Sequence, residues 1–194
     1  MDLTSEPISA YLGSDDVIEV EHPAVQALSA RLADQEPSPI GYARTAFTWV
    51  RDCIRHSLDV QDPRVTITAS ETLDAGVGLC FAKAHLLTAL LRARGIPSGL
   101  CYQRLADGTG HCVHGLIAVR LDDAWHRLDP RGNKPGVDAQ FDLERERLAW
   151  PVDVDRGEAD YPRVFTTAHP TVLASLRGAD DALALCEGGL PTQL

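Results

Sequence analysis

The sequence predicts an α+β fold, in which N-terminal helices and a central cysteine-bearing helix pack on an antiparallel β-sheet. Two observations predict it. Up to about residue 94 the apolar side chains recur at helical spacing, whereas residues 98–129 change to a two-residue alternation. Short turns separate the strand-like segments, as in antiparallel pairing. A set of helices followed by a set of strands favours the α+β class.

The length and composition indicate one ordinary globular domain. The 194 residues are 44% hydrophobic and 24% charged, which is typical of such domains. We expect a single domain over residues 1–194, with its core at about 39–141 and an irregular C-terminal extension at 142–194. The net charge of −10 argues against nucleic acid and an anionic membrane as partners.

The first residues and the cysteines bear on the compartment and on metals. Residues 1–7 lack the basic and apolar regions of a signal peptide, and no apolar run reaches transmembrane length, so we expect a cytoplasmic protein. The five cysteines are widely spaced without a CxxC motif. We therefore expect neither a disulfide framework nor a zinc site.

Two helices are expected before the central one. Pro23 suits a first helical position, and Val25, Leu28 and Leu32 follow it at helical spacing. A second apolar stripe predicts a helix at about 39–56. We expect both helices to pack against the central helix, and we assign no chemistry to them.

The central helix is predicted to begin near Cys80. Gly76 and Gly78 allow a tight turn before it, and the residues that follow Leu79 are mostly strong helix formers. Gly95 is the expected C-terminal stop. Cys80 would then lie in the first turn, where the partial positive charge of the helix favours a thiolate. Taken alone, such a cysteine is more often a small core residue.

The second half of the chain predicts a small sheet. Strands are expected at about 98–105, 112–120 and 124–129, with a further one at 137–141. The sequence 107–110 is a strong turn signal. The remainder is expected to be irregular, with one helix at 171–177 and a mobile tail from Glu187 onward.

The predicted hairpin 112–130 brings two functional groups together. A turn centred between Leu121 and Asp122 would place His114 opposite Asp129, with Cβ atoms about 5 Å apart. An imidazole would then lie beside a carboxylate on one face of the sheet. A slip of one residue in the register would separate them.

A cysteine at a helix start, with a histidine and an aspartate on neighbouring strands, is the arrangement used in nucleophilic catalysis. His114 would take the thiol proton of Cys80, and Asp129 would fix the tautomer of the imidazole and stabilise its protonated form. Each residue also has a structural interpretation. A strand histidine is usually half-buried with one hydrogen bond, and an aspartate before proline commonly starts a turn.

These residues belong to longer motifs that resemble the transglutaminase-like superfamily, and in particular its short bacterial members. The motifs are Gly76-x-Gly-x-Cys80, the run from Leu86 to Pro97, His114-Gly115 and Trp125-x-x-Leu128-Asp129. The likeness covers about residues 10–178. It implies a cysteine proteinase-like fold, with Cys80 as nucleophile, His114 as base and Asp129 as the orienting carboxylate. No metal or organic cofactor is implied.

Two further residues are candidates for this site. An acyl transfer needs donors directed at the developing oxyanion, and the backbone N–H of Cys80 and the side chain of Gln103 could supply them. Trp125 could form a wall of the site. Gln103 could equally be a solvated strand residue, and Trp125 could equally be part of the core.

The implied chemistry is attack of the Cys80 thiolate on an amide, ester or thioester carbonyl. The expected partners are a peptide, amide or acyl-thioester substrate and, for transfer, an amine acceptor. Water as second nucleophile gives a protease, amidase or deamidase, whereas an amine gives a transglutaminase or a small-molecule N-acyltransferase. A non-catalytic binding domain that retains the fold is the third alternative, because a shared fold does not fix function.

Overall fold

The computed structural model describes residues 3–108 and 110–194. Its α-helices are α1 (Pro23–Ala33), α2 (Pro39–Cys53), α3 (Ser57–Val60), α4 (Ala69–Ala75), α5 (Cys80–Arg92), α6 (Pro170–Arg177) and α7 (Ala182–Ala184). Shorter helical turns are η1 (Ile8–Leu12), η2 (Val154–Arg156) and η3 (Leu185–Gly189). The strands are β1 (Arg55–His56), β2 (Val77–Gly78), β3 (Ser98–Asp107), β4 (Gly110–Leu121), β5 (Ala124–Leu128) and β6 (Ala159–Asp160).

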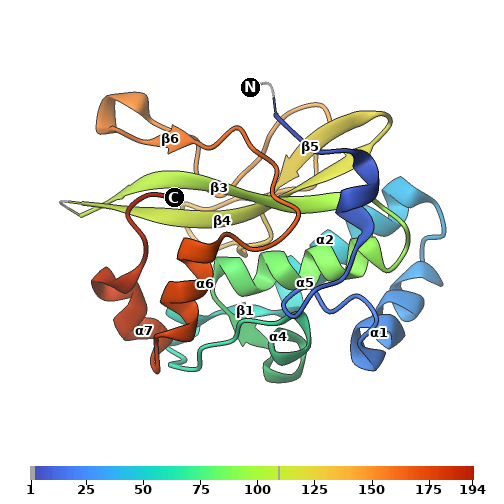
Figure 1. The fold of residues 1–194 in the computed structure, drawn as a ribbon, viewed down its shortest axis with the longest axis horizontal. Coiled ribbons are helices and arrows are strands. Elements are labelled where there is room, and N and C mark those ends of the chain that lie inside the picture. Colours follow the sequence, from blue (N-terminus) through green and yellow to red (C-terminus); the bar gives the residue numbers. More distant parts are fainter. Residues whose placement is uncertain (1–2, 109) are drawn as a thin grey trace.

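The main sheet is antiparallel, with the strand order β5-β4-β3-β6. Helices α1, α2, α4 and α5 lie on one side of it (Figure 1), and β6 pairs with β3 at one edge. β1 and β2 form a separate parallel pair, in which His56 lies opposite Gly78. This architecture confirms the predicted α+β class.

Helix α5 is the centre of the hydrophobic core. Each of its residues is buried, because the sheet covers one side of it and α1, α2 and α4 cover the others (Figure 1). A helix enclosed in this way can be apolar all round, which explains its Ala- and Leu-rich sequence. The core that it organises draws residues from Val17 to Leu185. Within the described ranges, no helix has the length and apolar character that crossing a membrane requires.

The predicted β4–β5 register is wrong by two residues along β4. The prediction pairs Gly115 with Leu128, whereas the structure places Ile117 opposite Leu128. The difference arises because the turn is centred between Asp122 and Asp123. Both aspartates have positive φ angles, of 48° and 62°, as in the two-residue turns that suit a hairpin.

This offset changes how the two functional groups of the hairpin meet. Because side chains on a strand alternate with a period of two, a shift of two residues keeps His114 and Asp129 on one face. They lie diagonally across the strands and do not face each other directly. The imidazole and the carboxylate therefore still come together, as the sequence predicts, but through a different pairing.

Two other expectations for the second half of the chain also need correction. Residues 137–141, all of which the structure describes, form no strand. The Asn133 side chain instead bonds both the N–H and the C=O of Ala139, at 2.8 and 3.3 Å, so these groups are not available to a ladder. The predicted 107–110 turn includes Thr109, which lies outside the described residues.

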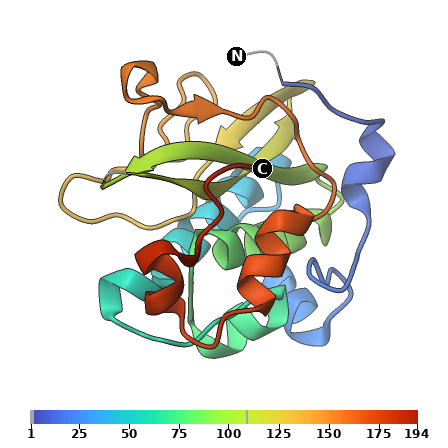
Figure 2. The same ribbon diagram turned by 60° about the vertical axis from the view of Figure 1, so that its left-hand side comes forward.

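The segment after Glu187, expected to be mobile, is held against the sheet. The N–H of Val113 on β4 donates to Pro191 O at 2.7 Å, and the N–H of Leu194 donates to the Tyr161 hydroxyl at 3.0 Å. Figure 2 shows this red segment running from α7 up to the sheet. Backbone pairing with a stretch of β4 that β5 does not cover explains why it is ordered.

Candidate active site

Cys80 is the first residue of α5. The conformation of the turn before it is set by a glycine and by strand pairing. Gly76 has a φ of +62°, which favours glycine, and the β1–β2 pairing anchors Val77 and Gly78. The Cys80 side chain is 7% exposed. The backbone N–H of Gly115 on β4 donates to its Sγ at 3.5 Å, so the sulfur lies against the strand that carries the predicted base.

His114 is buried on β4 between a sulfur and a carboxylate. Its Nε2 lies 2.8 Å from Asp129 Oδ2, and the ring of Trp150 meets it edge-on, with centroids 5.0 Å apart. Burial alone would lower the pKa of this imidazole. The Asp129 carboxylate and the neighbouring Cys80 outweigh burial and raise the pKa of His114 to about 10.

Asp129 follows β5 directly and is completely buried. In addition to His114, it accepts hydrogen bonds from the backbone N–H groups of Arg131, at 3.0 Å, and Ala149, at 3.1 Å. Burial would raise the pKa of this carboxyl, but His114 and the two N–H donors hold it below its ordinary value. The structure therefore keeps the carboxylate charged and its orientation fixed.

A cavity of about 580 Å³ opens at these residues. Cys80 and His114 line it together with side chains from distant parts of the chain, among them His56, Arg131, Trp150 and Leu190. The last two come from beyond residue 141, so the irregular extension contributes directly to the walls. A cavity of this size suits a side chain or a short chain segment of a larger substrate.

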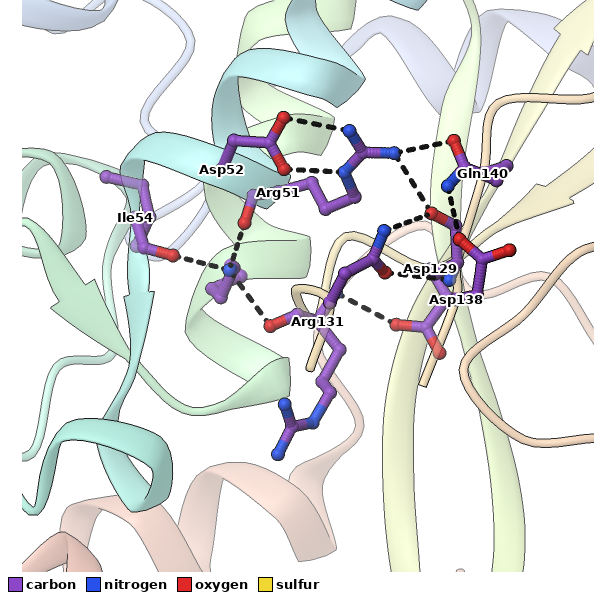
Figure 3. Close-up of polar contacts among 10 residues, drawn as sticks. Arg51, Asp52, Ile54, Asp129, Arg131, Asp138 and Gln140 are labelled. Carbon is purple, nitrogen blue, oxygen red and sulfur yellow. Dashed lines mark hydrogen bonds and ion pairs between the residues drawn. The ribbon is translucent and has the colours of Figure 1, made fainter. Parts of the chain in front are cut away.

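Lys83 connects α5, the helix that begins with Cys80, to the turn after Asp129 through hydrogen bonds. It lies about one turn along α5 and is completely buried, and its Nζ donates to the carbonyl oxygens of Arg51, Ile54 and Arg131. Burial, followed by the positive charge of Arg131, lowers the pKa of Lys83 to about 7. Figure 3 shows the Asp129–Arg131 turn beside Arg51 and Ile54 at the end of α2.

Arg131 extends this network to the cavity wall. Its guanidinium pairs with both carboxylate oxygens of Asp59 and lies 5.3 Å from the centre of the Trp150 ring. Burial would raise the pKa of Asp59, but hydrogen bonds from Arg131 and Lys134 hold it well below its usual range. The wall thus carries a fixed ion pair beside an aromatic ring.

Neither of the two less specific candidates lines the cavity, although Gln103 lies opposite His114 on the neighbouring strand. The Gln103 amide nitrogen donates to Asp160 Oδ1 at 2.9 Å and to Trp150 O at 3.5 Å, so its hydrogens are already engaged. Trp125 packs edge-on against Tyr11, with centroids 4.8 Å apart. Trp125 is half-buried against a small apolar cluster that includes Tyr11 and Leu116, about 13 Å along the strand from Asp129.

Several residues of the site were not singled out from the sequence. Lys83 had a detectable signal, because it is a charged residue in an otherwise apolar helix. His56, Arg131 and Trp150 had none, since their approach to Cys80 depends on long-range packing. In the part of the chain that the structure describes, no group of three or more His, Cys, Asp or Glu side chains is arranged to hold a metal ion.

Comparisons with known proteins agree with this fold. The sequence model of the transglutaminase-like superfamily matches residues 26–130. A solved candidate cysteine protease from Cytophaga hutchinsonii is similar in fold, with a TM-score of 0.55 and 17% identity over 67% of this chain and 46% of its own. The periplasmic domain of TgpA from Pseudomonas aeruginosa has a TM-score of 0.48 and 18% identity over 62% and 46%. The chain spans about half the length of these structures. No curated protein matches it.

Proposed function

Because the chain belongs to the transglutaminase-like superfamily, we propose that it is a cysteine-dependent acyl-transfer enzyme that acts on peptide or related amide bonds. The observation that carries the proposal is the presence of Cys80 and His114 in one cavity, with Asp129 bonded to the imidazole at 2.8 Å. This is the combination of nucleophile, base and orienting group that thiol catalysis requires.

In the proposed reaction, His114 takes the proton of the Cys80 thiol, and Asp129 stabilises the imidazolium that forms. The sulfur attacks the substrate carbonyl carbon, and the electron pair of the C=O bond moves onto oxygen. When this pair returns, the C–N bond breaks, and His114 gives its proton to the leaving amine. A thioester on Cys80 remains, and water or an amine then attacks it.

Two observations support peptide-type substrates in a reducing compartment. The cavity has apolar walls that suit a side chain. The five cysteines are free thiols, as expected in a compartment such as the cytoplasm. Hydrolysis and transfer to an amine share every step up to the thioester.

The test compares two thiols of one molecule. Exposed Cys53 is the internal reference for labelling with iodoacetamide at neutral pH, followed by peptide mass mapping. We expect Cys80 to label faster than Cys53, and His114→Ala to remove the difference. Equal labelling in the wild type, or an unchanged rate in His114→Ala, would refute the proposed pairing.

The second step is tested with casein as amide donor, in the presence and absence of monodansylcadaverine. Fluorescent casein indicates transfer to the amine, whereas new amino termini or released ammonia indicate hydrolysis. Cys80→Ala is the control and should show neither product. The absence of any product from the wild type would argue against casein-like peptides as substrates.

A further inference from the structure

His56 is a second histidine of the cavity, and nothing in the proposed reaction uses it. It lies at the end of β1, opposite Gly78 in the parallel pair, and Gly78 is two residues before Cys80. Its backbone is therefore fixed to the turn that positions the thiol. The side chain lines the cavity with Cys80 and His114 and is 7% exposed.

The ring nitrogens of His56 are unused. Among the described residues, neither has a hydrogen-bond partner, and Nδ1 is completely enclosed. Native structures contain few buried polar atoms without a partner, because such an atom loses its hydrogen bonds to water and gains none in return. Nε2 is not enclosed in this way, so it is the nitrogen through which His56 can reach the cavity.

The neighbouring charge indicates which nitrogen carries hydrogen. Burial, and next the positive charge of Arg131, lower the pKa of His56 to about 3, so the ring is neutral. The Nε–H of Arg131 is also enclosed and unpartnered within the described chain. A guanidinium can only donate hydrogen bonds, and its positive charge favours a lone pair over an N–H at the enclosed Nδ1. In a neutral imidazole the hydrogen then lies on Nε2.

We infer that His56 donates a hydrogen bond from Nε2 to the carbonyl oxygen of the substrate as that oxygen becomes negative. The inference rests on the proposed function. The backbone N–H of Cys80 is the second candidate donor, at the start of α5. A neutral imidazole can stabilise an oxyanion without first losing a proton to it, and a donor in an enclosed site acts more strongly than in water.

The experiment compares two reactions of Cys80. Iodoacetamide forms a C–S bond and loses iodide, and no oxyanion develops. With p-nitrophenyl acetate, the carbonyl oxygen carries the negative charge until p-nitrophenolate leaves. His56→Leu should therefore lower the acylation rate about 10²- to 10³-fold, with the alkylation rate within about twofold of the wild type. His56→Gln retains an N–H donor and should recover part of the loss.

His126→Gln is the matched control, because His126 lies on β5 with its Nε2 against Leu121 O, and both of its rates should equal those of the wild type. Equal losses in both reactions of His56→Leu would indicate a structural role and overturn the inference, as would an unchanged acylation rate. If Cys80 of the wild type reacts with neither reagent faster than Cys53, the proposed function itself fails, and this inference fails with it.

Discussion

Replacing Asp129 by asparagine tests the electrostatics of the site directly. Asparagine has nearly the same shape, but it removes the negative charge that lies 2.8 Å from His114 Nε2. Burial lowers the pKa of His114, and the Asp129 charge is the largest of the causes that raise it. We expect the imidazole in Asp129→Asn to lose its proton at a much lower pH than in the wild type.

The magnitude follows from the pKa of His114. A rise from 6.5 to about 10 corresponds to roughly 5 kcal/mol in favour of the imidazolium, since one pKa unit is about 1.4 kcal/mol. Asp129 shares this effect with Cys80, so its removal should lose part of these roughly 5 kcal/mol and lower the pKa of His114 toward its ordinary value. Because the pKa is raised in the folded state, this stability is present in full below pH 6.5 and is lost as the pH rises through 10.

The assay is an NMR titration of the His114 Cε1–H resonance, with urea unfolding at about pH 6 and pH 10. His114 in Asp129→Asn should titrate at a clearly lower pH than in the wild type. The variant should also unfold more easily than the wild type at about pH 6, with a smaller difference at about pH 10. Asp123→Asn is the control, because Asp123 is exposed and asparagine accepts its left-handed conformation. A midpoint that stays near the wild-type value in Asp129→Asn would refute the reasoning.

Three other changes probe the support of the site. Relative to Lys83→Met, the wild type should gain up to about 1.4 kcal/mol of unfolding free energy per pH unit between about pH 7 and pH 10. The reason is that burial lowers the pKa of Lys83, so the folded state releases its proton first. If the difference in urea-unfolding free energy between the two proteins stays constant across this range, the prediction is wrong. Gly115→Ala should cost about 1–3 kcal/mol and slow labelling of the nearby thiol, since the added Cβ would lie 2.6 Å from the Phe81 ring. Gly110→Ala on the same strand, with its nearest atom at 3.8 Å, should change neither. Arg131→Lys should lower the thermal midpoint, because lysine cannot reproduce the two parallel hydrogen bonds of the guanidinium, and an unchanged midpoint would show that the ion pair contributes little.

The sequence predicted the parts of the fold that depend on local patterns. Proline marks the start of α1 and glycine the end of α5, and the helical and two-residue spacings identify the main helices and β3 to β5. The turn at Asp122 and Asp123 lies one residue later than predicted. Two consecutive aspartates in the left-handed conformation are uncommon, and nothing local distinguishes them from a turn one residue earlier.

The candidate site was predictable only where its residues form motifs. Cys80, His114 and Asp129 were identified from spacing and family likeness. The partners that hold them were not, because the contacts of Lys83 with the Ile54 carbonyl and of Asp129 with a backbone N–H near residue 149 join segments far apart in sequence. Such contacts follow from packing of the whole chain and leave no periodic pattern.

The hydrogen bond from the Ala149 N–H to Asp129 has a consequence for protein synthesis. The thiol, the imidazole and the carboxylate leave the ribosome before Ala149, and Pro191, whose carbonyl pairs with Val113 on β4, follows much later. A nascent chain therefore carries these three side chains before it carries the Ala149 N–H that bonds Asp129. Since non-local contacts form late, the proposed activity of Cys80 should appear only after Ala149 has been made.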